Sequence, residues 1–315
     1  MPSAVWWIVT FAAASFGTLV LGLFTKWVDR KVTARVQWRV GPPWYQPVAD
    51  IVKLLGKETL VPEYAGGGFL LAPVVAFAAA CVAASLIWAA NVNPEARFVG
   101  DVIVVLYCLA VPSLMIILGG SASGNPHAAV GASREMKLLL AYELPLILSI
   151  VAVIVGAEGK ATLSLGAIAR SEMGGVLPSI ACVVGLIVAI FCIQAKMGLV
   201  PFDIAEAETE IMSGPFVEYS GPPLALFYMT KAILFAALPA FVVTVFWGGF
   251  GPGATGWALG ILKYLAVVVV MVLMRNTNPR VRIDHAMKFF WFGLTPIGIV
   301  ILALAVIGTA SVAAP

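Results

Sequence analysis

Eight apolar stretches, each long enough to cross a bilayer as a helix, constrain the fold of this 315-residue chain more than any other feature. The hydrocarbon core of a membrane requires about 20 consecutive apolar residues from a spanning helix. The stretches lie at residues 4–25, 69–90, 102–118, 138–157, 176–195, 224–247, 257–274 and 290–312. Because 61% of the residues are hydrophobic and only 11% are charged, the sequence predicts an all-α polytopic membrane protein with about eight transmembrane helices.

Basic residues are distributed unevenly among the connections between these stretches. The connections after the first, third, fifth and seventh stretches carry 14 of the 19 lysines and arginines, and those after the second, fourth and sixth carry 3. Lysine and arginine favour the cytoplasmic side of a membrane. We therefore expect the odd-numbered connections to be cytoplasmic and both termini to lie outside.

The first cytoplasmic segment, residues 26–68, predicts a short amphipathic helix. Gln46-Pro47 begins it, because proline suits the first turn of a helix. Apolar residues then recur at helical spacing, at Val48, Ile51, Val52 and Leu55. Such a helix fits the membrane surface or the underside of a docked subunit, and ordinary headgroup contact by a basic segment is the simpler alternative.

The connection at residues 196–223 concentrates acidic residues. Five of the 16 acids of the chain occur here within sixteen residues, at Asp203, Glu206, Glu208, Glu210 and Glu218. Carboxylates packed closely beside apolar surface tend to have raised pKa values, which suits proton transfer. A solvated loop between two helices is the alternative interpretation.

The local pattern in this acidic connection has two structural interpretations. Asp203-Ile-Ala-Glu206 resembles the start of a helix, which would place Glu206 and Glu210 on one face. A re-entrant or cavity-lining segment is also compatible, since irregular backbone at membrane depth is tolerated against protein or water. Lys231, early in the next span, is a candidate charge partner for one of the acids.

Glu143 lies within the fourth predicted span, roughly 8 Å from its start at 1.5 Å per residue. An ionisable group at this depth costs a few kcal/mol unless it is partnered or hydrated. The following Pro145 removes one helical hydrogen bond and should free the carbonyl of Ala141. Glu143 is therefore a candidate proton relay, with a structural ion pair as the alternative.

Several classes of function and cofactor are disfavoured. The four cysteines contain no CxxC pair, so neither an Fe–S cluster nor a structural zinc is supported, and we expect no metal or other cofactor on this chain. A dispersed net charge of +3 does not indicate nucleic-acid binding. We find no inverted repeat of a secondary transporter and no second aspartate-rich motif of a prenyltransferase. Without linkers or repeats, residues 1–315 are predicted to form a single membrane domain.

Two long motifs carry a family resemblance. The segments VPFDIAEAETEIMSGPFVEYSG and RKVTARVQWRVGPPWYQPVADIVKLLGKE resemble the subunit 1 family of respiratory complex I, whose members are also called H subunits, and the related group 4 membrane-bound [NiFe] hydrogenases. The quinone-reducing branch typically has a longer insertion before the glutamine-proline pair. The compact form here, GPPWYQP, and the sequence Arg134-Glu135-Met136-Lys137 before AYELP look more like the energy-converting hydrogenase and formate hydrogenlyase branch.

The resemblance implies a role at the foot of a soluble redox arm. The chain would be a membrane-anchor and proton-path subunit without its own redox centre, in the cytoplasmic (inner) membrane of a prokaryote. Its acids, Asp203, Glu206, Glu208, Glu210 and Glu218, would line a junction cavity, and Glu143 would be the next proton carrier. Residues facing the arm would be Arg30, Lys31, Arg35, Arg39, Gln46 and Asp50.

The same resemblance implies the partners. In the hydrogenase branch these would be large and small hydrogenase subunits, Fe–S subunits and antiporter-like membrane subunits, with the NiFe centre and Fe–S clusters in the partners. In the complex I branch, NADH:quinone oxidoreductase, the same cavity would hold a quinone. A stand-alone secondary transporter is the distant alternative.

Overall fold

The computed structural model describes residues 4–93, 100–157, 163–170 and 176–313, and in these ranges the chain is helical with no strand. The long helices are α1 (Ala4–Val36), α3 (Gly68–Val92), α4 (Asp101–Ala122), α5 (Pro126–Gly156), α7 (Val176–Lys196), α9 (Pro222–Phe246), α10 (Gly253–Thr277) and α12 (Thr295–Ala313). The short elements are α2 (Gln46–Leu55), α6 (Leu165–Ile168), α8 (Glu208–Ile211), a 3-10 turn η1 (Gly214–Phe216), α11 (Ile283–Lys288) and a π-helical turn η2 (Phe289–Leu294).

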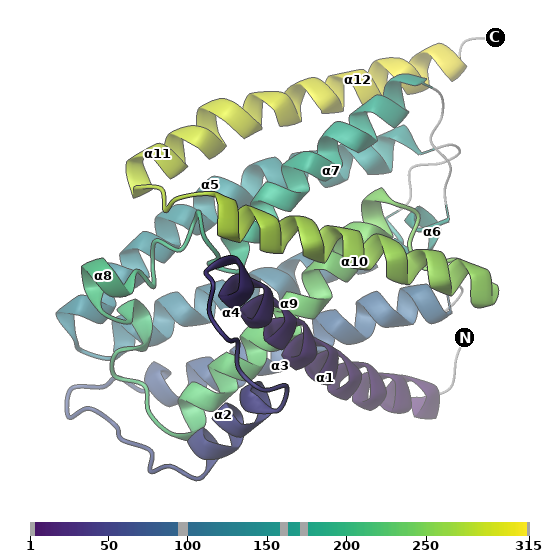
Figure 1. Ribbon diagram of the computed structural model, residues 1–315. Coiled ribbons are helices and arrows are strands. Elements are labelled where there is room, and N and C mark those ends of the chain that lie inside the picture. Colours follow the sequence, from purple (N-terminus) through teal and green to yellow (C-terminus); the bar gives the residue numbers. More distant parts are fainter. Residues whose placement is uncertain (1–3, 94–99, 158–162, 171–175, 314–315) are drawn as a thin grey trace.

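Eight helices in the described part are long and apolar enough to cross a membrane, with α11, η2 and α12 forming the last as one continuous rod. The predicted all-α polytopic fold with eight spans is therefore confirmed. The start of α1 and the end of α12 lie at the same side of the bundle, whereas α2, α8 and α11 lie at the other (Figure 1). Which of these sides faces the cytoplasm stays a prediction.

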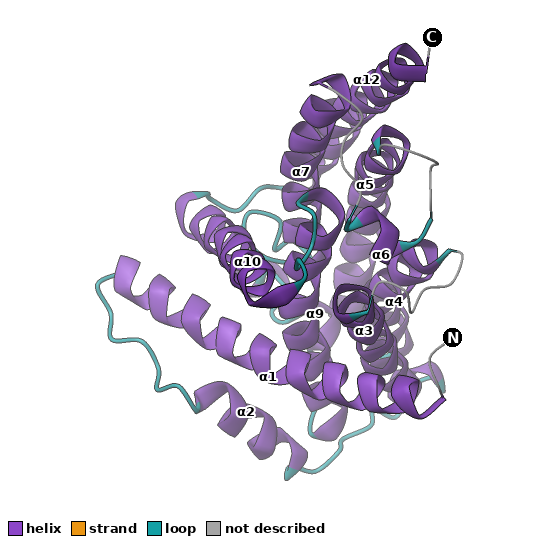
Figure 2. Cartoon of the chain, turned by 90° about the vertical axis from the view of Figure 1, so that its right-hand side faces the viewer, coloured by secondary structure: helices purple, strands orange, loops and turns teal. Residues whose placement is uncertain are grey.

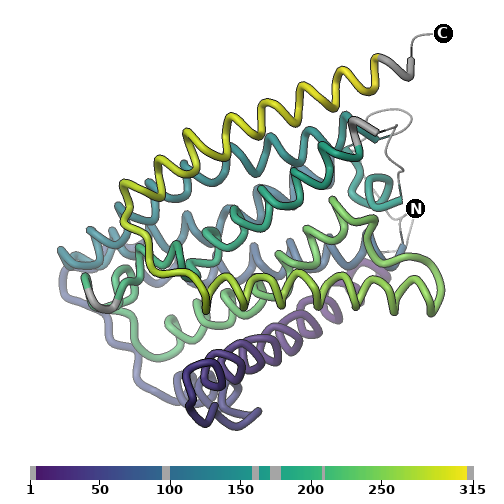
Figure 3. The backbone as a smooth tube through the Cα atoms, turned by 45° about the horizontal axis from the view of Figure 1, so that its top comes forward, coloured from purple at the N-terminus to yellow at the C-terminus, as the bar shows by residue number. Residues whose placement is uncertain are grey.

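Helix α9 forms the centre of the bundle. In its most apolar window 89% of the residues are buried, against 22% in α1 and 33% in α10. Figure 2 shows α9 inside and α1 and α10 towards the outside. α1 and α3 pack on α9 from one side, while α5, α7 and α12 pack against one another on the other, so that α1 and α12 lie at opposite edges (Figure 3).

Three spans extend at one end by seven residues or more beyond the apolar stretches that predicted them. α1 continues past residue 25 to Val36, α5 begins at Pro126 rather than 138, and the last rod begins at Ile283 rather than 290. The start of α5 has a clear cause, because the Asn125 side chain accepts a hydrogen bond from the backbone N–H of His127 at 2.8 Å and Pro126 occupies the first turn. Charged residues that the sequence placed in connections therefore lie on helices.

The predicted short helix after the first span is confirmed as α2. Pro47 and Ile51 are buried against the bundle, while Val48, Val52 and Leu55 are 47%, 63% and 49% exposed. The apolar residues are thus divided between the protein interior and a face that this chain leaves uncovered.

The predicted helix start at Asp203 is wrong. Residues 203–207 are irregular, and the first helix of the acidic connection is α8 at Glu208–Ile211. The backbone of Gly214 packs against the carbonyl of Ala205, and Asp203 and Glu206 bind cations on other segments of the chain. These tertiary contacts override the local preference for a helix. The segment is instead irregular and lines a cavity, which was the second interpretation of the sequence.

The close crossing of α1 and α9 gives a test of this packing. A methyl group on Gly22 would overlap the backbone carbonyl of Ala232, whereas nothing lies near Gly17 on the same helix. We expect Gly22→Ala to destabilise the protein by about 1–3 kcal/mol, because overpacking forces the helices apart. The apparent unfolding temperature in detergent measures this.

Gly17→Ala is the matched control and should leave the unfolding temperature unchanged or slightly higher, since alanine favours a helix over glycine. Equal shifts in the two variants would contradict the close α1–α9 crossing.

Candidate functional site

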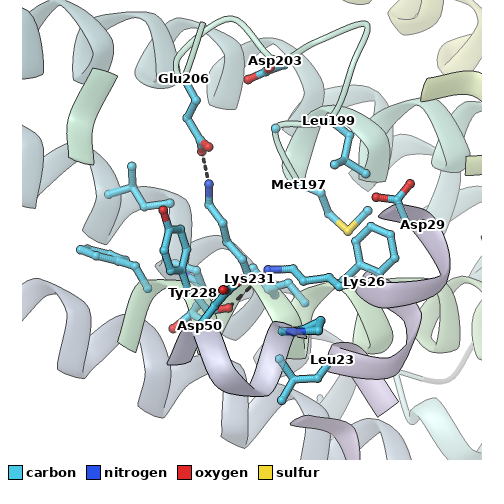
Figure 4. Close-up of a pocket in the computed structure, with 18 of the residues that line it drawn as sticks. Leu23, Lys26, Asp29, Asp50, Met197, Leu199, Asp203, Glu206, Tyr228 and Lys231 are labelled. Carbon is cyan, nitrogen blue, oxygen red and sulfur yellow. Dashed lines mark hydrogen bonds and ion pairs between the residues drawn. The ribbon is translucent and has the colours of Figure 1, made fainter. Parts of the chain in front are cut away.

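A cavity of about 810 Å³ lies at the same end of the bundle as α2, between α1, α2, α9 and the acidic connection. Its far wall reaches α4, α5 and the end of α7. Figure 4 shows charged side chains from α1, α9 and the acidic connection lying around it. A cavity so rich in charge is a candidate site for proton transfer.

Two acids of the acidic connection line this cavity, and each binds a cation from another segment. Glu206 binds Lys231 of α9, and the two side chains point toward one another in Figure 4. The Asp203 carboxylate accepts from Arg280, which follows α10, at 2.7 Å. Because the negative charges are compensated, carboxylates can lie side by side next to apolar surface.

The wall formed by α1 contributes further charges. Asp29 is buried and binds Arg275 of α10. The Lys26 ammonium donates to the carbonyl oxygen of Tyr228 at 3.4 Å. Arg30 binds Asp50 of α2 at 3.0 Å, so the ion pairs of this wall hold α1 against α2 and α10.

Glu143 lies beside the cavity rather than among its lining residues. Its carboxylate accepts from the Lys196 ammonium at 2.7 Å, and the Lys196 side chain is 0% exposed. Lys196 itself lines the cavity and lies 5.4 Å from the centre of the Tyr142 ring. The structural ion pair considered for Glu143 is therefore present, and its partner connects it to the cavity.

The remaining acids of the connection lie elsewhere. Glu210 is 56% exposed and accepts from Arg134 of α5 at 2.5 Å. Glu218 accepts from the Asn125 amide. Neither lines the cavity, so among the four acids whose side chains the structure describes, Asp203 and Glu206 share one cavity and the other two do not. The side chain of Glu208 lies outside the described residues.

The residues expected to face a soluble arm have two different arrangements. Gln46 donates to Asp50 at 2.8 Å, and together with Arg30 these side chains tie α2 to α1. Arg35 and Arg39 are less constrained, and both are exposed. Lys31 is half-buried and donates to the carbonyl of Gly41 at 3.4 Å.

Sequence reasoning missed several charged residues of the site, among them Lys26, Asp29, Glu135 and Lys196. Glu135 is 6% exposed and lines the cavity, although its charged neighbours had placed it in a connection. Asn125-Pro126 is a helix-start signal that would have placed Glu135 inside α5. Asp29 and Arg275 lie 246 residues apart, and no local pattern reports their contact.

Comparison with known proteins shows to which family this chain belongs. A family model described as NADH dehydrogenase matches residues 8–306. The chain belongs to the NADH dehydrogenase subunit 1/H family. Its relatives in this family include the H subunit of NADH-quinone oxidoreductase from Anoxybacillus flavithermus, 34% identical over 93% of this chain and 92% of the relative, and that from Dehalococcoides mccartyi, 34% identical over 94% and 85%.

A solved structure of similar fold is a chain of the membrane-bound sulfane sulfur reductase, described as an archaeal respiratory membrane complex. Its TM-score is 0.84 at 29% identity, covering 95% of this chain and 99% of that one. The family assignment thus extends along nearly the whole chain in both sequence and structure.

The protonation of Asp203 is a measurable property of this site. Burial and, after it, the negative charge of Glu206 raise its pKa from 3.8 to about 6, although Arg280 opposes the shift. The folded state therefore holds a proton that the unfolded chain releases, so the contribution of Asp203 to stability falls as the pH rises from about 4 to about 6.

We expect Glu206→Gln to lower the pKa of Asp203 and Arg280→Gln to raise it, because the first removes a repelling charge and the second an attracting one. Infrared titration of the carboxyl band that Asp203→Asn abolishes measures both shifts. Shifts of the same sign in the two variants would contradict this account of the site.

Proposed function

We propose that this chain is the membrane-anchor and proton-path subunit of a multi-subunit oxidoreductase complex. It couples electron transfer in a docked soluble arm to ion translocation. The observation that carries the proposal is the charged cavity at the α2 end of the bundle, which reaches Lys196, the partner of Glu143.

The coupling follows from the electrostatics of the cavity. A change of charge or hydration at the docked arm alters the proton affinity of nearby carboxylates, and the pKa of Asp203 is already raised to about 6. Protons taken up there move through the cavity to the Glu143–Lys196 pair inside the membrane. Because the sites are close, they titrate as a group rather than singly.

The surface around the cavity supports docking of a soluble arm. Trp38 is 98% exposed beside the exposed Arg39, and aromatic and arginine side chains are enriched at protein interfaces. On α2, Val52 is 63% exposed, which suits a second partner or the membrane surface.

For the arm itself, we propose a group 4 hydrogenase-type complex. The compact Gly41–Gln46 connection, which resembles that branch, favours it. The partners are then large and small hydrogenase subunits, Fe–S subunits and antiporter-like membrane subunits. The NiFe centre and Fe–S clusters belong to those partners, and protons are reduced to hydrogen there.

A complex I-type arm is the second candidate, favoured by the curated relatives, which are named as H subunits of NADH-quinone oxidoreductase. The cavity fits a quinone headgroup in size and chemistry, because Lys26 offers an ammonium donor and Leu23, Phe227 and Ile116 offer apolar walls. When bound, a quinone would accept the electrons of the arm.

Metal analysis of the intact complex, purified through a tag on this chain, separates the two candidates. Nickel with iron, together with hydrogen evolution from a reduced dye, is expected for the hydrogenase-type arm. Iron and flavin without nickel, with quinone reduction, would replace it by the complex I-type arm. A chain that leaves gently solubilised membranes alone and metal-free would overturn the subunit proposal and favour a transporter.

Glu143→Gln tests the proton path in either type of complex. We expect ion translocation per electron to be abolished, because glutamine cannot carry a proton, while electron transfer with artificial donors is largely kept. Proton uptake by sealed vesicles, measured with a pH-sensitive dye, gives the ratio.

Glu143→Asp is the matched control, since it keeps an ionisable group and should retain part of the translocation. Full translocation in Glu143→Gln would overturn the proposed path.

A further inference from the structure

Lys196 lies between the cavity and the membrane interior. Its ammonium binds Glu143 at 2.7 Å, and its side chain also lines the cavity that contains Glu135. A fully buried ammonium requires a negative partner at all times, because an unpaired charge in a low-dielectric region is costly. Lys196 is thus placed to interact with both carboxyl groups.

Glu135 differs from the other acids of the cavity. Asp29, Asp50, Asp203 and Glu206 each bind a lysine or arginine. Within the described part of the chain, Glu135 has no such salt bridge although it is 6% exposed. A buried carboxyl group without a cation at bonding distance is most stable when it holds a proton.

Two buried hydroxyl groups link the cavity wall to the Lys196 site. Ser113 of α4 lines the cavity together with Glu135, and its hydroxyl lies 3.2 Å from that of Tyr142. Tyr142 is 0% exposed, precedes Glu143 in α5 and lies under the Lys196 ammonium. Hydrogen-bonded hydroxyls in a buried network keep a carboxyl group in place.

We propose that Glu135 is a proton donor to Glu143 and that Lys196 is their shared counter-ion, which changes partner as the proton passes. The inference deepens the proposed function and rests on it. Its new content is that the cavity delivers protons to Glu143 through Glu135 rather than through Asp203 or Glu206 directly.

The charges balance in this step. The two carboxyl groups lie eight residues apart on α5, about 12 Å at 1.5 Å per residue, so the proton passes through the hydroxyl groups of Ser113 and Tyr142. The O–H bond of the Glu135 carboxyl group breaks, each hydroxyl accepts one proton and donates another, and an O–H bond forms on the Glu143 carboxylate. Neutral Glu143 no longer binds the Lys196 ammonium, which turns to the new Glu135 carboxylate. The three residues carry zero net charge before and after, so no uncompensated charge is created in the membrane.

Glu135→Gln tests this donor, and glutamine has the shape of the protonated side chain, so the complex should assemble. We expect ion translocation per electron in sealed vesicles to fall at least about tenfold, as for loss of a proton-transfer group. Glu135→Asp should restore part of it, whereas a merely structural role would be served at least as well by glutamine. The exposed Glu63→Gln is the control and should translocate normally.

A second experiment tests the role of Lys196 as the shared counter-ion. Lys196→Met should lose translocation even where Lys196→Arg keeps it, because arginine supplies the charge that both carboxylates need. Normal translocation in Glu135→Gln, with loss in Glu143→Gln, would overturn this inference and leave the proposed function intact. Normal translocation in both would overturn the proposed function itself.

Discussion

Charge compensation within a membrane-embedded bundle is the constraint on which this structure depends. Burying an ionisable group without a partner costs several kcal/mol, and this chain places many such groups at one end of its helices. Asp29 on α1 binds Arg275 on α10, and Lys196 on α7 binds Glu143 on α5. Each pair joins segments distant in sequence, so the charges hold the helices together as well as forming the site.

The centre of the bundle is filled by apolar side chains instead of paired charges. Between Ala232 and Val243 every side chain of α9 is apolar and buried, and the packing is close enough for the Ala232 carbonyl to lie against Gly22 of α1. Only toward its start does α9 carry a charge, Lys231, which binds Glu206. The change from apolar packing to paired charges along one helix places the cavity at the end of the bundle where a soluble partner is proposed.

Irregular backbone in the acidic connection follows from the same constraint. A regular helix at 203–210 would place successive carboxylates on one face, where they repel each other. The observed chain instead sends Asp203 to Arg280, Glu206 to Lys231 and Glu210 to Arg134. Each of these three acids reaches a different cation, which lowers the repulsion. Among the described side chains of this connection, the acids that line the cavity are Asp203 and Glu206.

The sequence by itself determined the eight spans, the short helix at Gln46 and the family, because hydrophobic length and local motifs are one-dimensional properties. It also located Glu143 and the acidic connection as unusual. Only the tertiary structure decided which charges meet: Lys196 with Glu143, Asp29 with Arg275, and Glu135 inside the cavity. Those contacts depend on how the helices pack together, because the paired residues lie more than fifty positions apart in the sequence. Ion pairs between such distant residues produce no periodic pattern in the sequence, so they cannot be predicted from it.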